Sequence, residues 1–130
     1  MKSFLLILST IFNLLSCSSK NNINTIIVGN DADEHGCKRS TGSQWSQTKN
    51  ECIQPFTEGI KLKPVSAAST QAAYILVDYN QIEIFSTEIS GSVVVHKINN
   101  NKWKNESWEI KKVNDKYILE KDGKTLYKSN

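Results

Sequence analysis

The sequence predicts an all-β protein with one short helix, built as a small antiparallel meander that curls into an OB-like or an up-and-down barrel. Between residues 72 and 128, short segments rich in β-branched and aromatic residues follow one another, with apolar and polar positions alternating. The joints between these segments carry Asn, Asp and Gly, which are residues of tight turns. A sheet with one apolar face has to cover that face, and curling into a barrel does so.

The expected strands share apolar residues at alternating or consecutive positions. They lie around residues 60–62, 74–77, 81–85, 93–98, 103, 108–110, 117–119 and 126–127. Pro64 ends the first of them, and a further strand is expected at 26–28. Trp103 and Trp108 are five positions apart, so on one regular strand they would face opposite sides; we expect one in the core and one exposed.

The connections are short and suit hairpins. Turn residues fall at 78–81, 99–101 and 113–116, and Asp122-Gly123 is the strongest signal because that dipeptide favours a type I′ turn. The short helix is expected at Trp45 to Glu51, with Ser43 as its cap. Helical spacing would place Trp45, Thr48 and Cys52 on one inward face, with Trp45 as a core anchor.

The first 16 residues predict a secretory signal rather than a part of the fold. One Lys precedes an uncharged, mostly apolar run from Phe4 to Leu15, which is too short to span a bilayer as a helix. The residues Leu14-Leu15-Ser16-Cys17 resemble the bacterial lipobox, which implies cleavage before Cys17 and a diacylglycerol on its thiol. The acyl chains would anchor the protein to the membrane.

The chain is therefore divided into a signal peptide (1–16), a lipidated tether (17–29) and one β-domain (30–130). The tether is small and polar, and no acidic residue follows Cys17, which favours the outer membrane, facing the periplasm or the cell surface. With Cys17 lipidated, Cys37 and Cys52 remain, and an exported chain meets an oxidising compartment, so we expect them to form a disulfide.

Length and charge exclude several classes of protein. A chain of 130 residues holds one domain, and a net charge of +3 is too weak to indicate a nucleic-acid partner. We expect a monomer.

A metal site or an active site is not expected. Asp31, Asp33, His35 and Gly36 start like an EF-hand loop, but Gly42 stands where a bidentate Glu is needed. A pair of His35 and Ser40 with Asp31 or Asp33 is conceivable, but no catalytic motif specifies it. We therefore expect no cofactor and no enzyme.

The segment from Cys37 to Gly42 is the candidate reactive loop of a protease inhibitor. Lys38 and Arg39 follow a bridged Cys and precede Ser40 and Thr41, and trypsin-like proteases cut after Lys or Arg. The pattern is similar to the reactive loop of Bowman–Birk inhibitors. A bridge from Cys37 to Cys52 would close a ring of roughly 16 residues and contribute about 3 kcal/mol. A rigid loop binds tightly because less ordering is needed on binding.

A wider signature carries a second resemblance. Its residues are Asp33, His35-Gly36-Cys37, Ser40, Gly42, Trp45-Ser46, Asn50, Cys52-Ile53, Pro55-Phe56 and Gly59-Ile60. The pattern resembles a family of small bacterial lipoproteins related to the potempins, which are protease inhibitors with a small OB-like barrel. The resemblance implies inhibition of a serine or a metalloprotease. Thr41-Gly42-Ser43 departs from the family's Ala-Gly-Tyr, so an aromatic residue is missing.

Two other functions compete with the inhibitor. One is an envelope binding module for a glycan or a protein, using a face with Trp103, Trp108 and Tyr117; the other is a lysozyme inhibitor. The inhibitor hypothesis requires residues 38–40 to be exposed and not helical.

Overall fold

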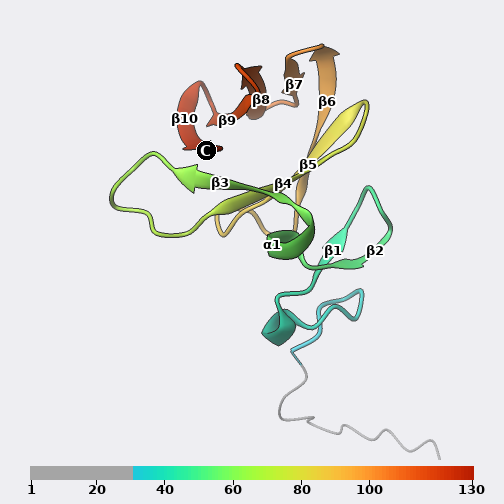
Figure 1. The fold of residues 1–130 in the computed structure, drawn as a ribbon. Helices are drawn as coiled ribbons and strands as arrows, with labels where there is room; N and C mark the ends of the chain where they lie inside the picture. The colour runs from blue at the N-terminus through green and yellow to red at the C-terminus, as the bar shows by residue number, and fades with distance from the viewer. Residues whose placement is uncertain (1–30) are drawn as a thin grey trace, which may run out of the picture.

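The computed structural model describes residues 31–130, and these form an eight-stranded closed barrel with a smaller segment docked outside it (Figure 1). The barrel strands are β3 (Ile60–Pro64), β4 (Ala73–Val77), β5 (Gln81–Phe85), β6 (Val93–Asn99), β7 (Lys102–Lys104), β8 (Trp108–Val113), β9 (Lys116–Lys121) and β10 (Lys124–Lys128). Each pairs antiparallel with the next, and β10 pairs with β3 to close the barrel. The predicted all-β meander is confirmed, and of the two barrel types considered its strand order is the up-and-down one.

The signal peptide, the tether with Cys17 and the strand expected at 26–28 lie outside the described residues.

The hairpin turns have the backbone that their residues favour. Asp122 and Gly123 have φ values of 49° and 79°, and Asn114 and Asp115 have 50° and 62°. A type I′ turn needs positive φ at both central positions, and Asn, Asp and Gly tolerate it best. These two turns fix the register of β8, β9 and β10.

The barrel interior is filled by apolar side chains. The buried cluster consists of Leu62, Ala73, Ile75, Ile82, Ile84, Val95, Trp103, Trp108, Ile110, Leu119 and Tyr127. Both Trp103 and Trp108 belong to it, with 5% and 6% of their surface exposed, so the expectation that one is exposed is wrong. They lie on different strands, β7 and β8, and a turn between them resets which side chains point inward.

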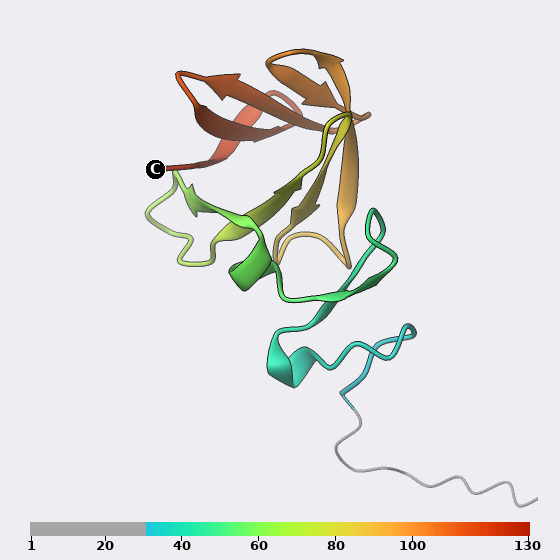
Figure 2. The ribbon, with the colours of Figure 1, turned by 45° about the vertical axis from the view of Figure 1, so that its right-hand side comes forward.

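The chain before the barrel forms a stapled segment (residues 31–54), which lies outside the barrel beside β4 and β5 (Figures 1 and 2). It holds a single 3₁₀ turn, η1 (Arg39–Thr41), and a hairpin of β1 (Gln44–Ser46) and β2 (Glu51–Ile53). The prediction of a helix at Trp45 to Glu51 is therefore wrong. The short helix is α1 (Pro55–Glu58), where Pro55 occupies the first helical position, at which its missing N–H costs nothing.

A turn replaces the expected helix, and its polar groups, the hydroxyls of Ser46 and Thr48 and the N–H of Gln47, bind Glu83 of the barrel. Asn50 adopts a positive φ of 53°, and its N–H donates to the Ser46 carbonyl, which closes the hairpin. Trp45 is paired with Cys52 across the hairpin and is only half-buried, so it is not a core anchor.

The hairpin is held on the barrel by Glu83, which lies on the outer face of β5 and is fully buried. Its carboxylate accepts hydrogen bonds from Ser46 Oγ (2.6 Å), Gln47 N (2.7 Å) and Thr48 Oγ1 (2.7 Å), and from the hydroxyl of Ser92. Beside it, an apolar contact joins Ile53 of β2 to Leu76 and Phe85 of the barrel. The stapled segment thus docks through one charged centre and one small apolar cluster.

The pKa of Glu83 reflects this environment. Burial by itself raises the pKa, because it disfavours the charged carboxylate. The hydrogen bonds donated by Ser46, Ser92, Thr48 and the Gln47 backbone outweigh burial, so the pKa lies below its ordinary value of 4.5. The ionised carboxylate is therefore the form that the fold stabilises.

Replacing the charge should weaken the docking. For Glu83→Gln we expect the free energy of unfolding to fall by about 1.5–3 kcal/mol, the range for a hydrogen bond to a charged group. The contribution of Glu83 is complete above pH 4.5, the ordinary value, and is lost as the pH falls through the lower pKa of the folded state. The stability gap between wild type and variant, measured by urea unfolding, should therefore stay constant above pH 4.5 and narrow as the pH falls below it. Glu106→Gln, at an exposed position, is the control; a gap that is independent of pH would contradict this role.

Candidate functional site

The predicted disulfide between Cys37 and Cys52 is confirmed. It joins the start of the candidate loop to the middle of β2, with Cα atoms 5.5 Å apart. Cys37 is completely buried, whereas Lys38, Arg39, Ser40 and Thr41 after it are exposed. The bridge therefore fixes an accessible basic loop to the docked hairpin.

The loop has a defined shape that the sequence did not indicate. Lys38 is extended, with φ −84° and ψ 108°, but Arg39–Thr41 form the 3₁₀ turn η1. The Lys38 carbonyl accepts hydrogen bonds from Thr41 N (3.2 Å), Ser43 N (3.2 Å) and Thr41 Oγ1 (2.7 Å). Residues 38–40 are thus exposed, as an inhibitor requires, but the second requirement, a non-helical backbone, is met only by Lys38, because Arg39 and Ser40 lie in the 3₁₀ turn.

Two aspartates order this loop from within. Asp31 accepts a hydrogen bond from Ser40 N, and hydrogen bonding from Ser40 holds the pKa of Asp31 below its ordinary value. Asp33 accepts from the backbone N–H of His35 and of Cys37, both at 2.9 Å. Their oxygens therefore satisfy backbone donors, as Asp side chains do in turns.

The acidic residues do not gather into a metal site. Within residues 31–130, no group of three or more His, Cys, Asp or Glu side chains is placed to hold a metal ion. The His35 ring is stacked on Trp45, with ring centroids 4.2 Å apart and planes 9° from parallel.

Gly42 ends the loop at a point where no other residue fits easily. Its φ is +74°, and a Cβ there would lie 2.5 Å from Cε1 of Phe56 on α1. Thr41 is fixed nearby, because Gln54 Nε2 donates to its carbonyl at 3.0 Å. The loop is thus packed against α1 as well as cross-linked to β2.

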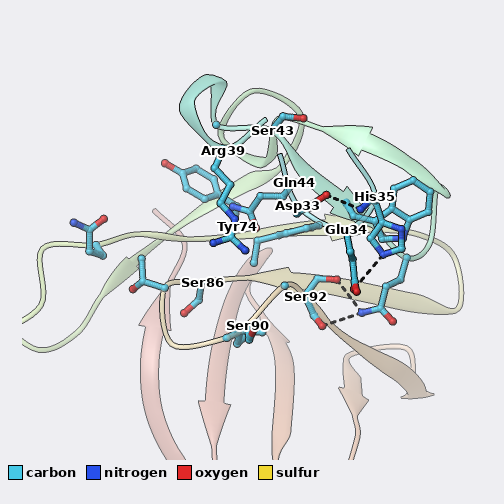
Figure 3. A pocket seen from close by; sticks show the side chains of 18 of the residues that line it. Asp33, Glu34, His35, Arg39, Ser43, Gln44, Tyr74, Ser86, Ser90 and Ser92 are labelled. Carbon is cyan, nitrogen blue, oxygen red and sulfur yellow. Dashed lines mark hydrogen bonds and ion pairs between the residues drawn. The ribbon is translucent and has the colours of Figure 1, made fainter. Parts of the chain in front are cut away.

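A groove of about 1100 Å³ runs between the stapled segment and the loop from β5 to β6 (Figure 3). One wall carries Asp33, Glu34, His35, Arg39, Ser43, Gln44, Trp45 and Gln47, and the other Gln71, Ala72, Tyr74, Phe85, Ser86, Thr87, Ile89, Ser90, Gly91 and Ser92. Gln47 Nε2 crosses the groove to the carbonyl and hydroxyl of Ser92, at 2.8 and 2.9 Å. Sequence reasoning missed this groove. The one signal for it was the charged Glu83 inside the apolar stretch 82–85.

The structure brings Cys37, Cys52 and residues 38–42 together, but it removes the alternative aromatic face. Trp103 and Trp108 are buried in the barrel, so a surface made of these two indole rings does not exist. The aromatic residues that line the groove are different ones, namely His35, Trp45, Tyr74 and Phe85.

Comparison of the chain with protein-family models, with curated proteins and with solved structures finds no match. None of the helices in residues 31–130 is long and apolar enough to cross a membrane.

The packing of Gly42 gives a test of the loop's rigidity. Gly42→Ala should reduce stability by about 1–3 kcal/mol for the left-handed backbone and by a further amount for the clash with Phe56, measured by thermal unfolding. Gly36→Ala is a matched control, because Gly36 has φ +84° with nothing within 4 Å of the added Cβ. Equal losses for the two variants would mean that the contact with Phe56 does not matter.

Proposed function

We propose that the protein is a lipid-anchored envelope protein that inhibits a trypsin-like protease, with Lys38 as the residue that enters the specificity pocket. The observation that carries the proposal is the state of Lys38. Its side chain is exposed, its backbone is extended, and it directly follows the buried, cross-linked Cys37. A basic side chain on a rigid base suits an acidic pocket, and little ordering is needed on binding.

Lys38 is favoured over Arg39 by the direction of the chain. Arg39 begins the 3₁₀ turn, and its side chain extends between Gln44 and Tyr74 into the groove (Figure 3). The Arg39 side chain therefore lies in the groove of the protein itself, whereas Lys38 does not line the groove and is free to contact a protease.

The turn also supports slow cleavage. A serine protease has to bind the carbonyl oxygen of the bond that it cuts in its oxyanion hole. The Lys38 carbonyl is already bound by Thr41 and Ser43, and the Arg39 carbonyl accepts from Gly42 N at 2.8 Å. A protease that takes up Lys38 would therefore meet an occupied carbonyl in a closed turn, and the bond from Lys38 to Arg39 would be cut only when the turn opens.

Inhibition assays with single variants test this proposal. The full chain, purified in mild detergent, should inhibit trypsin-like proteases, and Lys38→Ala should weaken inhibition by about tenfold or more, because an unpaired acidic group stays buried in the pocket. Arg39→Ala is the matched control and should inhibit like wild type. Zinc endopeptidases and lysozyme belong in the same titration. Inhibition of either of these alone, or no effect of Lys38→Ala, would contradict the proposed target.

The anchor is a separate prediction that rests on Cys17, which lies outside the described residues. Wild-type protein should incorporate labelled palmitate and sediment with membranes, because buried acyl groups contribute about 0.8 kcal/mol per CH₂. Cys17→Ser should abolish the label and release the protein to the soluble fraction. A variant that stays labelled would exclude Cys17 as the site.

A further inference from the structure

Exposed apolar side chains gather at one end of the barrel, which we call the turn end (residues 77–81, 97–102, 112–117 and 128). Seven large apolar side chains are exposed in residues 31–130, and four of them lie here: Val77, Tyr79, Ile98 and Val113. Tyr79, in the turn from β4 to β5, is 80% exposed, and Ile98 near the end of β6 is 62% exposed. The turns of this end point away from the loop that contains η1, which lies at the opposite end of the molecule (Figures 1 and 2).

Backbone hydrogen bonds join the three turns of this end into one surface. Lys97 N donates to the carbonyl of Asn80 at 2.8 Å, which ties β6 to the turn between β4 and β5. Lys112 N donates to the carbonyl of Asn101 at 2.9 Å, which ties β8 to the turn between β6 and β7. The exposed apolar residues lie next to these positions in the chain, so they form one continuous rim.

Lysines surround this rim. The charged residues of the turn end are five lysines and two aspartates, namely Lys97, Lys102, Lys112, Lys116, Lys128, Asp78 and Asp115. Two of the lysines are paired, Lys102 with Glu109 at 3.1 Å and Lys112 with Asp115 at 3.3 Å. The other three make no ion pair with any described residue. The excess charge is therefore positive, and it suits an anionic partner.

Two of the lysines lie over aromatic rings. Lys97 Nζ is 4.8 Å from the centre of the Tyr79 ring, and Lys112 Nζ is 5.6 Å from the centre of the Tyr117 ring. The turn end thus presents an apolar ring and an ammonium group side by side. Tyrosine and lysine share this behaviour at a membrane–water interface, where the apolar part of each side chain enters the lipid and the polar tip stays at the headgroups.

We propose that the turn end of the barrel docks on a bilayer that contains anionic lipids, with Tyr79 and Ile98 entering the headgroup region and the lysines contacting lipid phosphates. Lysines alone would suit any anionic polymer, but apolar tips and lysines on one rim suit a charged lipid surface. A second copy of the chain is a poor occupant, because a symmetric contact would bring the same unpaired lysines together.

Docking in this way fixes the orientation of the protein. It turns the loop of residues 38–42 away from the bilayer, because that loop lies at the opposite end of the molecule (Figure 1). Asp31 follows Cys17 by fourteen positions, and at 3.3–3.6 Å per residue this length reaches at most about 50 Å. A domain of this size has a radius of gyration of about 13 Å, so the chain is long enough to pass it. The proposal does not rest on protease inhibition by Lys38.

An environment-sensitive fluorophore tests the proposal with the full chain reconstituted into vesicles. A nitrobenzoxadiazole label on Ile98→Cys reports whether the turn end enters the headgroup region. The same label on Val65→Cys is the matched control, because Val65 is also exposed but follows β3 at the other end of the barrel. Cys37 and Cys52 are bridged and do not react, and the chain without an added cysteine gives the background.

The label should respond to lipid charge at one position only. In vesicles of equal parts phosphatidylcholine and phosphatidylglycerol, we expect the label at residue 98 to brighten severalfold and to emit at shorter wavelength, because it leaves water. In vesicles of phosphatidylcholine alone it should stay as in water. The label at residue 65 should stay as in water in both.

Charge variants of the Ile98→Cys chain complete the test. Lys116→Gln with Lys128→Gln should lower the ratio of docked to free protein about tenfold or more, because each lysine near an anionic surface contributes about fivefold. Lys38→Gln with Lys124→Gln removes the same charge from exposed positions outside the turn end and should dock like wild type. Lys38→Ala should lose protease inhibition and keep docking, so either proposal can fail alone.

Four outcomes would overturn the proposal. Equal responses at residues 98 and 65, equal responses in neutral and anionic vesicles, or no effect of the variant that lacks Lys116 and Lys128 would each show that the turn end does not dock on charged lipid. A response of the label at residue 98 without vesicles, increasing with protein concentration, would make the turn end an interface between copies of the chain.

Discussion

The arrangement of the candidate site depends on one buried carboxylate. Glu83 lies on the outer wall of the barrel, where a charge without partners would be costly, and the turn of the β1–β2 hairpin supplies the donors that it needs. The dependence is mutual, because a two-stranded hairpin is at best marginally stable alone. The hydrogen bonds to Glu83 and the contact of Ile53 with Phe85 fix the stapled segment on the barrel, and the disulfide cross-links the segment internally. The groove exists because the segment is held in this position.

The strands of the barrel offer little for the recognition of another protein. Its eight strands are closed, so their backbone groups pair with each other and leave no edge. Its interior is filled by the apolar cluster that includes both Trp103 and Trp108. Among residues 31–130, the free strand edges therefore belong to the small β1–β2 sheet. For this reason the proposed contact with a protein partner lies on the stapled segment.

Two neighbouring cations on that segment have different surroundings. Lys38 follows the buried Cys37 and faces outward, whereas Arg39 enters the 3₁₀ turn and lies in the groove. The sequence alone left open which of the two is the specificity residue, because both follow the Cys and both are basic. The backbone distinguishes them, because Lys38 is extended and Arg39 begins the 3₁₀ turn.

The sequence by itself determined the barrel strands and their hairpin turns. These are local properties: alternation marks each barrel strand, and residues such as Asp122-Gly123 select a turn through their own φ values. The disulfide followed from the cysteine count, since only Cys37 and Cys52 remain once Cys17 is assigned to a lipid. The tertiary structure decided the pairing of β10 with β3, the inward direction of both Trp103 and Trp108, and the groove. The tertiary structure also decided that residues 45–51 form a hairpin and not the expected helix. The hydrogen bond from Ser46 to Glu83, which holds this hairpin, joins residues 37 positions apart. A contact between residues so far apart in the sequence leaves no local pattern, so the helical spacing of Trp45, Thr48 and Cys52 was the only signal available.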